Sequence, residues 1–303
     1  MIKTKKAEIA LLTDHRYTAE TADEDDWYFK NILYEDELLQ NALREHGITS
    51  IRVDWADPDV DWSNFQCAVF RTTWDYFDRI SEFRPWLEKA SSQTRLYNKP
   101  SLIWWNLDKH YLADLEKKGI PIVPSLFFET GSTINLKNLL DETGWDEAVI
   151  KPCVSGAARH TYRINKNNAG DFQEKVQSLL AEESFILQPF ISNVMDSGED
   201  TLVIIDGQYT HAVRKLPKKG DFRVQDDHGG TVHSYQPTKE QIELAEKAMA
   251  ACPSAPVYGR VDMVKDENKN WAVMELELIE PELWLRENPD AAKQFGRAIS
   301  RIL

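Results

Sequence analysis

Residues 257–265 (VYGRVDMVK) and 271–279 (WAVMELELI) are the stretch that decides the fold, and they predict two consecutive β-strands. Side chains at alternate positions of a strand point to the same face, so Glu275 and Glu277 share one face. If Asp262 of the preceding strand points the same way, three carboxylates converge. Oxygen ligands of this kind suit magnesium, which proteins usually hold through a few carboxylates and substrate phosphates. The pair therefore indicates a metal site, and an acidic, solvated strand face is the alternative.

Upstream of this pair, strands and helices alternate along the first part of the chain. Strands are expected at residues 8–13, 48–54 and 67–72, and helices at residues 34–46 and 83–91. An acidic loop that includes residues 23–26 follows the first strand. Such alternation favours an α/β unit with a largely parallel sheet.

A second unit is expected from about residue 98 and a third from Gly198. The second has expected helices at residues 106–118, 136–143 and 172–182 and strands at residues 120–128, 147–154, 160–165 and 185–190. The third opens with a hairpin of residues 201–206 and 208–215, followed by a polar loop at 217–233, a helix at 238–251, the two acidic strands and a C-terminal helix. The hairpin turns at Asp206-Gly207, a favoured turn pair, and Thr238 with Gln241 has the capping-box pattern.

Composition narrows the classes of protein that the chain can represent. The net charge of −14 disfavours nonspecific nucleic-acid binding, which needs a basic surface. No apolar run approaches the roughly 20 residues that a membrane-spanning helix requires. The three cysteines, Cys67, Cys153 and Cys252, are odd in number and lack metal-ligand spacing. We therefore expect a reduced, cytoplasmic protein without nucleic-acid or membrane partners.

Basic residues upstream of the acidic strands are candidates for phosphate binding. Lys151 lies on a predicted strand and is followed by the small-residue loop at 155–158 (SGAA), whose backbone N–H groups could approach phosphate oxygens. Lys109 lies in a predicted helix of the same unit. Taken singly, both could be ordinary surface lysines. Because neither GxxxxGK[ST] nor GxGxxG occurs, a P-loop or a dinucleotide-binding fold is not expected.

A third group of charged residues follows the hairpin of the third unit. Arg214-Lys215 ends a strand, the sequence GDFR occupies residues 220–223, and Gly229-Gly230 comes next. A loop with arginines and glycines could close over a phosphate and exclude water. A flexible, charged hairpin loop is the alternative.

The ordered set of these pieces resembles the ATP-grasp superfamily over about residues 98–290. The pieces are Lys109, KPCVSG from Lys151, QPFI from Gln188, Gly198-Glu199, Arg214, GDFR from Gly220, Gly229-Gly230, RVD from Arg260 and ELE from Glu275. The pattern is similar to the ATP-binding domain of prokaryotic glutathione synthetase and, in part, to D-alanine–D-alanine ligase and cycloserine-forming ATP-grasp ligases. The resemblance implies an N-terminal open α/β domain at residues 1–97, a small ATP-grasp lobe at 98–188 and a large lobe at 189–303.

The resemblance also implies a role for each matching residue. ATP would contact Lys109, Lys151, Ser155, Gly156, Gln188, Pro189, Phe190, Ile191, Glu199 and Lys215. Magnesium would be held by Asp262, Glu275 and Glu277, with Glu280 and Glu282 less favoured. Arg260, Arg223 and Arg214 would serve catalysis, and Gly229 and Gly230 would lie beside the substrate.

Three departures from the glutathione synthetase pattern put its substrate in doubt rather than its nucleotide. Glu277 stands where the third metal ligand is usually asparagine, which keeps an oxygen ligand. Thr201 replaces an arginine near the ribose contact, and Gln225 replaces a loop asparagine.

The implied activity is an ATP-dependent carboxylate–amine ligase that works through an acyl-phosphate on an amino acid or small peptide. The implied cofactors are ATP and two Mg²⁺ ions, with Mn²⁺ as an alternative, and a homodimer is compatible with the sequence. In the first domain, Arg71 follows a predicted strand and could hold a substrate carboxylate, with Asp75 or Asp26 near an amino group. An ordinary salt bridge is the alternative for Arg71.

Three other activities compete with this interpretation. A cyclising ATP-grasp ligase would close one substrate's own carboxylate and amine. A phosphotransferase of the same fold would stop after phosphorylating a stable acceptor. A nucleotide sensor would bind ATP without turnover, although the retained acidic and basic residues argue against it.

Overall fold

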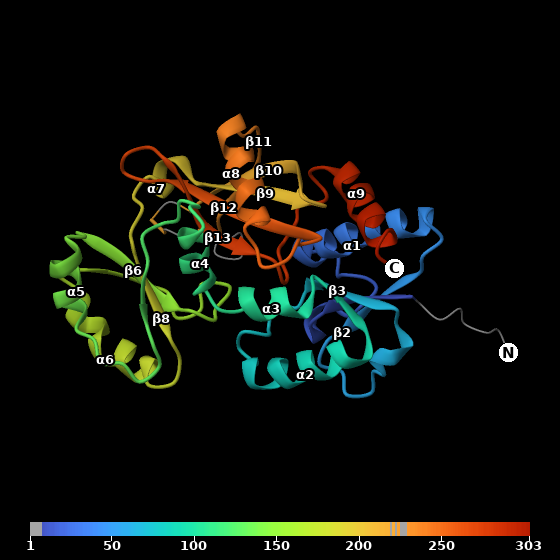
Figure 1. Ribbon diagram of the computed structural model, residues 1–303, viewed down its shortest axis with the longest axis horizontal. Helices are drawn as coiled ribbons and strands as arrows, with labels where there is room; N and C mark the ends of the chain where they lie inside the picture. Colours follow the sequence, from blue (N-terminus) through green and yellow to red (C-terminus); the bar gives the residue numbers. More distant parts are fainter. Residues whose placement is uncertain (1–7, 219, 222, 225–228) are drawn as a thin grey trace.

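The structure is a computed structural model that describes residues 8–218, 220, 221, 223, 224 and 229–303. The described strands form three separate sheets (Figure 1). In that view, a parallel sheet from the N-terminal part lies on the right, a small antiparallel sheet lies on the left, and a larger antiparallel sheet lies above and between them. This mixed α/β architecture confirms the expected fold class.

The first sheet is entirely parallel, as the alternation of strands and helices predicts. In spatial order its strands are β2 (Ser50–Asp54), β1 (Ile9–Thr13), β3 (Cys67–Thr72) and β4 (Arg95–Tyr97). Its helices are α1 (Trp27–Glu45), α2 (Ile80–Gln93) and the short 3-10 helices η1 (His15–Tyr17) and η2 (Trp62–Asn64). Helix α1 begins seven residues before the predicted start because the Asp26 carboxylate accepts a hydrogen bond from the Phe29 N–H at 2.9 Å and caps the helix.

The small antiparallel sheet lies within residues 126–189. In spatial order its strands are β5 (Leu126–Phe128), β8 (Phe185–Pro189), β6 (Glu147–Pro152) and β7 (Tyr162–Asn165), and helices α5 (Leu136–Thr143) and α6 (Ala169–Leu180) pack on it. The predicted strand at 120–128 was wrong over most of its length. Pro121 and Pro124 fall inside it, and proline cannot donate to a strand ladder.

The predicted helix at 106–118 is also wrong as a single element. The chain forms α3 (Pro100–Asn106) and α4 (Tyr111–Lys117) with a turn between them. In this turn the Asp108 carboxylate accepts a hydrogen bond from the His110 N–H at 3.0 Å. Aspartate side chains that bond to nearby backbone groups in this way favour turns over helix interiors.

The large antiparallel sheet carries the acidic strands. In spatial order its strands are β11 (Thr231–Tyr235), β10 (Gln208–Leu216), β9 (Glu199–Ile205), β12 (Tyr258–Lys265) and β13 (Trp271–Glu277). The helices of this region are α7 (Val194–Ser197), α8 (Lys239–Ala250) and α9 (Pro289–Ser300). The capping box of Thr238 and Gln241 is confirmed at the start of α8. Strand β11 was not predicted, because its sequence, TVHSY, is polar and mostly exposed and therefore resembles a loop.

The parallel sheet and the large sheet share one hydrophobic core. Leu43 of α1 and Val69 of β3 pack in the same cluster as Val203 of β9, Tyr258 of β12 and Phe295 of α9. The small sheet has a core of its own, whose buried residues lie within 134–187 of the described chain. It also contacts the large sheet, because Ile186 of β8 packs in one cluster with Leu202 and Val261.

A buried asparagine fastens the shared core. The Asn98 side-chain amide donates to the carbonyl oxygens of Tyr258 and Leu278, both at 2.8 Å, and its oxygen accepts from the Val257 N–H at 2.6 Å. The Tyr258 hydroxyl also donates to the Ile279 carbonyl at 2.7 Å. These bonds join the end of the first region to both acidic strands.

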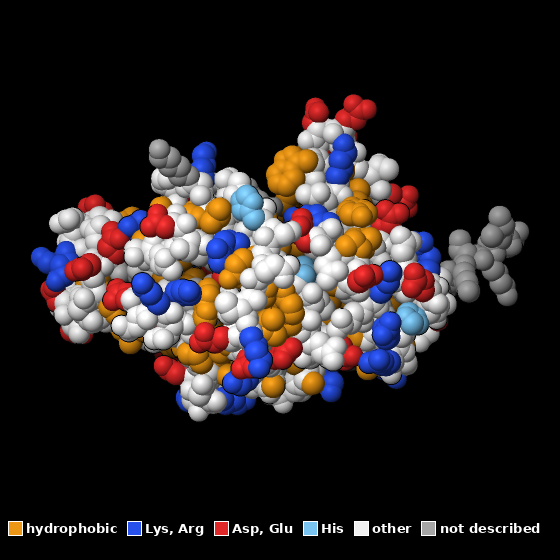
Figure 2. All heavy atoms as spheres, turned by 90° about the horizontal axis from the view of Figure 1, so that it is seen from above, with side chains coloured by type: hydrophobic (Ala, Val, Ile, Leu, Met, Phe, Trp, Pro, Cys, Tyr) orange, Lys and Arg blue, Asp and Glu red, His pale blue; other side chains and the backbone are white. Residues whose placement is uncertain are grey.

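The surface carries charges of both signs. Figure 2 shows lysine, arginine, aspartate and glutamate side chains interspersed over one face, without a single large basic area. None of the described helices combines the length and apolar character needed to cross a membrane.

Candidate active site

A cleft of about 520 Å³ lies where the three sheets approach one another. Trp74 and Phe77 line it from the first region, Lys151 from the small sheet, and Asp262 and Glu275 from the large sheet. Its size falls in the range of about 300–1,000 Å³ that is typical of ligand pockets.

The three predicted metal ligands meet in this cleft. Strands β12 and β13 pair so that Asp262 lies opposite Glu275 and Arg260 lies opposite Glu277. All of these residues line the cleft. The structure therefore brings the three carboxylates onto one face, and carboxylate oxygens in such a group are a donor set that fits magnesium.

Each carboxylate of the group already has a cationic partner. Lys109 Nζ lies 2.9 Å from Glu275 Oε1, and Lys215 Nζ lies 3.0 Å from Asp262 Oδ2 and 2.5 Å from Glu199 Oε1. The Arg260 guanidinium donates to both oxygens of Asp262, at 3.0 and 2.8 Å, and also to Glu277. These contacts hold the acidic side chains in place without a ligand.

The pKa values differ along the row of carboxylates. Burial alone would raise the pKa of Asp262, but Arg260 and Lys215 outweigh it and hold the pKa below its ordinary value. Burial raises the pKa of Glu277 to about 7, despite its contact with Arg260. Burial and the nearby Glu277 charge raise the pKa of Glu280 to about 8. At Glu277 and Glu280 the nearby cations therefore do not offset burial, and a divalent cation would favour the charged form of both.

Lys151 differs from the other two lysines of the cleft. Burial lowers its pKa, and no hydrogen bond or ion pair of its ammonium occurs among the described residues. The neighbouring loop is tightly packed, because a Cβ atom at Gly156 would lie 2.4 Å from the Phe77 ring. Lys109 Nζ donates to the Ser155 carbonyl at 2.8 Å, which ties this loop to the carboxylates. A free ammonium beside a small-residue loop suits a phosphate oxygen.

The segment 188–191, which is predicted to contact adenine, lines the cleft on the side of the small sheet. Gln188, Pro189, Phe190 and Ile191 all line it, and the Gln188 side-chain amide donates to Ser125 Oγ at 3.0 Å. The Phe190 ring packs under the Arg163 guanidinium at 3.7 Å. This segment joins the small sheet to α7 and the large sheet.

The structure does not bring every predicted residue into the cleft. Arg214 points to the opposite face of β10 from Lys215, where it pairs with Asp200 at 2.6 Å and stacks on Tyr235 at 4.1 Å. The period of two in a strand decides this difference between neighbours. Gly229 and Gly230 lie outside the residues that line the cleft, whereas Arg223 lines it. Phe222 and Gln225 lie outside the described residues.

The predicted substrate residues of the first region are also engaged elsewhere. Arg71 is 3% exposed. Its Nε lies 2.9 Å from Asp36 Oδ1, and its Nη2 lies 3.7 Å from Glu35 Oε2. Asp75 accepts from Trp55 Nε1 at 2.7 Å and from Arg79 at 2.8 Å. Asp26 is the cap of α1. The geometry favours the salt-bridge alternative for Arg71 and a structural role for both aspartates.

An aromatic wall that the sequence did not reveal borders the cleft on the first region's side. It consists of Tyr17, Tyr28, Trp74 and Phe77, with the Trp74 ring 5.7 Å from Tyr17 and 5.9 Å from Tyr28. Trp74 Nε1 donates to the Glu280 carbonyl at 2.9 Å, which joins the wall to the acidic strand. The only sequence signal was the aromatic density around residue 74, because Tyr17 and Tyr28 are distant in the chain.

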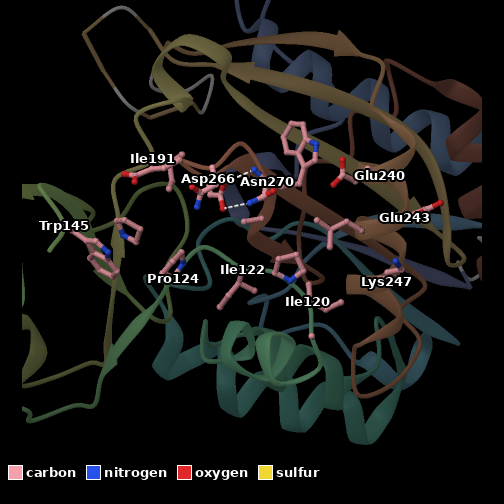
Figure 3. A pocket seen from close by; sticks show the side chains of 18 residues that line it. Ile120, Ile122, Pro124, Trp145, Ile191, Glu240, Glu243, Lys247, Asp266 and Asn270 are labelled. Carbon is pink, nitrogen blue, oxygen red and sulfur yellow. Dashed lines mark hydrogen bonds between the residues drawn. The ribbon is translucent and has the colours of Figure 1, made fainter. Parts of the chain in front are cut away.

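A second hollow of about 700 Å³ lies beside the segment 188–191 (Figure 3). Ile120, Ile122 and Trp145 line it together with Glu240 and Lys247 of α8. It shares two residues, Pro189 and Ile191, with the cleft. None of the predicted phosphate-binding lysines or metal-binding carboxylates lines it, so we place the chemistry in the smaller cleft.

The sheets, the lysines and the carboxylate row together define an ATP-grasp enzyme. The ATP-grasp domain model of prokaryotic glutathione synthetase matches residues 124–255, and the N-terminal domain model of D-cycloserine synthetase DcsG matches residues 9–98. The cycloserine biosynthesis protein DcsG of Streptomyces lavendulae is 34% identical over 288 residues, which cover 89% of this chain and 94% of that protein.

Solved structures agree with this placement. The crystal structure of D-cycloserine synthetase DcsG has a TM-score of 0.85 at 32% identity and covers 97% of this chain and 99% of its own. D-alanine–D-alanine ligase from Bacillus anthracis has a TM-score of 0.64 at 15% identity, with 98% and 96% covered, and so shares the fold. The chain belongs to the DcsG family of ATP-grasp ligases, and it is an ATP-dependent ligase that forms carbon–nitrogen bonds.

Proposed function

We propose that this enzyme phosphorylates the carboxylate of a small amino-acid substrate and closes it onto a nitrogen of the same molecule. The observation that carries the proposal is the size of the cleft. About 520 Å³ must hold both the nucleotide and the substrate, and the aromatic wall bounds the end next to the carboxylates. A small substrate that carries its own nucleophile fits this space better than two separate substrates. The full-length similarity to a cycloserine synthetase supports the same choice.

ATP would lie between the two sheets of the ATP-grasp region. Lys109, Lys151 and the loop at Ser155 would hold the phosphates, and the adenine would lie against the segment 188–191. Glu199 and Lys215 would lie near the ribose and phosphates. The support is that all of these residues line one cleft and that Lys151 has an ammonium available for a phosphate oxygen.

Two Mg²⁺ ions, or Mn²⁺ in their place, would be held by Asp262, Glu275 and Glu277, whose oxygens suit hard divalent cations. When bound, such ions neutralise charge on phosphate oxygens. The present partners of these carboxylates, Lys109, Lys215 and Arg260, are basic groups that would turn toward the phosphates as the ions bind.

The reaction then follows from the positions of the chain's own groups. A substrate carboxylate oxygen attacks the γ-phosphorus, the bond to the β-phosphate oxygen breaks, and ADP leaves. Arg260 and Arg223 line the cleft and would donate to the transferring phosphoryl oxygens. The substrate's nitrogen next attacks the acyl carbon and phosphate leaves with the bonding electron pair. The proton lost from nitrogen can pass to a carboxylate of the cleft or to the phosphate.

Product mass decides between ring closure and the joining of two molecules. Purified enzyme would be incubated with ATP, Mg²⁺ and a panel of amino acids whose side chains end in a nucleophilic nitrogen. We expect a product lighter than one substrate molecule by one water, with one ADP and one phosphate released for each. A product made from two molecules would overturn cyclisation while leaving the ligase chemistry intact.

Trapping with hydroxylamine tests the activated intermediate. We expect a hydroxamate when a substrate is present, because hydroxylamine attacks an acyl-phosphate. A stable phosphorylated substrate and no hydroxamate would instead indicate a phosphotransferase.

We also propose a cytoplasmic location and a small-molecule partner rather than a nucleic acid or a membrane. All three cysteines are buried and unpaired, which suits a reducing compartment. The net charge of −14 disfavours a polyanionic partner.

A further inference from the structure

A group of metal-binding side chains lies beside the cleft, at the turn between α3 and α4. One potential ligand atom from each of Asp108, His110 and Cys153 lies within 4.8 Å of the other two. Asp108 and His110 are partly exposed, whereas Cys153 is fully buried behind them. The group is therefore open to solvent on its carboxylate and imidazole side and closed on its sulfur side.

His110 is held between two carboxylates. Its Nδ1 lies 2.5 Å from Asp108 Oδ1, and its Nε2 lies 3.1 Å from Glu129 Oε1. The ring also stacks on Phe127 with 4.4 Å between the centroids. Both ring nitrogens therefore face carboxylate oxygens, so the orientation of the ring is fixed by its two acidic neighbours and by Phe127.

The buried sulfur decides which cations suit the group. Cys153 is fully buried, and a thiol that binds a metal ion does so as the thiolate, with its proton released. Thiolate and imidazole ligands are typical of zinc and related metals, whereas magnesium prefers oxygen ligands alone. A site of this composition is distinct in its chemistry from the carboxylate row of the cleft.

We propose that Asp108, His110 Nδ1 and Cys153 Sγ form a binding site for a divalent transition metal of the zinc class. Glu129 would accept a hydrogen bond from Nε2–H and so orient the ring, an arrangement that is common behind metal-bound histidines. With three protein ligands, the fourth tetrahedral position is open to water.

The site is connected to the nucleotide cleft through Lys109. The Lys109 N–H donates to the Cys153 carbonyl at 3.0 Å, and its Nζ contacts both Ser155 O and Glu275. Because Lys109 lies between two ligands in the sequence, a bound ion would fix the backbone that carries this lysine.

Cobalt substitution tests the site in the full-length enzyme. The protein would be stripped with a chelator and titrated with Co²⁺ in the presence of excess Mg²⁺, which competes for the all-oxygen carboxylate row. We expect one equivalent of Co²⁺ to produce a sulfur-to-cobalt charge-transfer absorption in the near ultraviolet. One equivalent of Zn²⁺ should remove it. Absence of the band would overturn the proposal.

Matched cysteine variants identify the sulfur ligand. Cys67 and Cys252 are also buried, and burial raises the pKa of each thiol to about 12, so Cys67→Ala and Cys252→Ala are controls for Cys153→Ala. We expect only Cys153→Ala to lose the band. A band that survives this variant would show that the sulfur ligand lies elsewhere and would overturn the assignment.

Two further variants test the imidazole without relying on the cysteine. His110→Phe keeps an aromatic ring against Phe127 and should lower Zn²⁺ affinity at least tenfold. Glu129→Gln removes the orienting carboxylate, for which a loss of about 10- to 100-fold is typical. Wild-type Zn²⁺ affinity in His110→Phe would overturn the proposed site.

Discussion

Two buried clusters of arginine and carboxylate lie in this enzyme, and only one of them faces a cleft that can hold a ligand. In the cleft, Arg260 contacts Asp262 and Glu277 on β12 and β13. In the first region, Arg71 of β3 contacts Asp36 and Glu35 of α1. In each cluster the arginine lies on a strand, and the sequence offered a ligand-binding role for both arginines.

The difference lies in the space beside the charges. The cleft offers about 520 Å³, whereas the hollow beside Arg71 offers about 10 Å³, room for about one water molecule. Raised carboxyl pKa values do not separate the two clusters, because burial raises the pKa of Glu35 beside Arg71 just as it raises those of Glu277 and Glu280 in the cleft. Open space next to buried charge therefore distinguishes a ligand site from a structural ion pair.

The strongest test of this comparison is the loss of a cleft carboxylate, for which we expect the largest effect on kcat. Asp262→Asn keeps the side-chain shape but removes the charge of a proposed metal ligand. Its amide oxygen can still accept the hydrogen bond that Thr201 Oγ1 donates to Asp262 Oδ1 at 2.8 Å in the wild type. We expect kcat to fall by about 10³-fold, near 4 kcal/mol, measured as ADP release. A variant that retains full turnover would show that Asp262 has neither a metal nor a catalytic role.

The matching change in the cluster of Arg71, Asp36 and Glu35 should affect stability rather than catalysis. Asp36→Ala leaves the Arg71 guanidinium buried without its close partner and also removes a 2.9 Å contact with Arg52. We expect the free energy of unfolding to drop by about 3 kcal/mol, with kcat unchanged at a temperature where the variant is folded. Urea denaturation measures the first quantity. A large loss of kcat without destabilisation would restore a substrate role for this cluster.

A smaller effect is expected from the pH dependence of stability without added metal. The pKa of Glu280 is about 8 in the folded chain and near its ordinary value when unfolded, so the folded state retains a proton that the unfolded state has lost. Stability should therefore fall as the pH rises from about 5 to about 8.

Glu280→Gln mimics the protonated side chain and should remove part of this fall. We expect it to be more stable than the wild type by about 1–2 kcal/mol at pH 9 and similar at pH 5. Thermal denaturation at both pH values measures the change. Equal pH dependence in the two proteins would show that Glu280 is not the group responsible.

The smallest expected effect is that of Arg214→Gln. Arg214 is partly exposed and pairs with Asp200, which also accepts a hydrogen bond from Gln241 at 2.9 Å. We expect a loss of about 1 kcal/mol of stability and kcat within about threefold of the wild type. Lys215→Gln, the next residue, is the control that should reduce activity strongly, and similar kinetics in both variants would contradict the assignment of faces.

The sequence predicted those parts of the fold and site that depend on local periodicity. Alternation along β13 placed Glu275 and Glu277 together, and the capping box located the start of α8. Alternation also distinguishes Arg214 from Lys215, but the correct face was not known until the sheet was paired. The aromatic wall could not be predicted, because Tyr17 and Tyr28 reach the cleft only through tertiary packing. The contacts of Arg71 with Asp36 and Glu35 could not be predicted either, because a strand motif does not show which helix residues pack against it.

The shared core of the parallel and large sheets has a consequence for how ATP would be held. Asn98 and Tyr258 hold these two sheets together, whereas the small sheet has a second core of its own on the side of α5 and α6. Lys109 contacts Glu275 of the large sheet, and Lys151 lies on β6 of the small sheet. A triphosphate that contacts both lysines would link the small sheet to the large one. Its cleavage to ADP would weaken that link as the product forms.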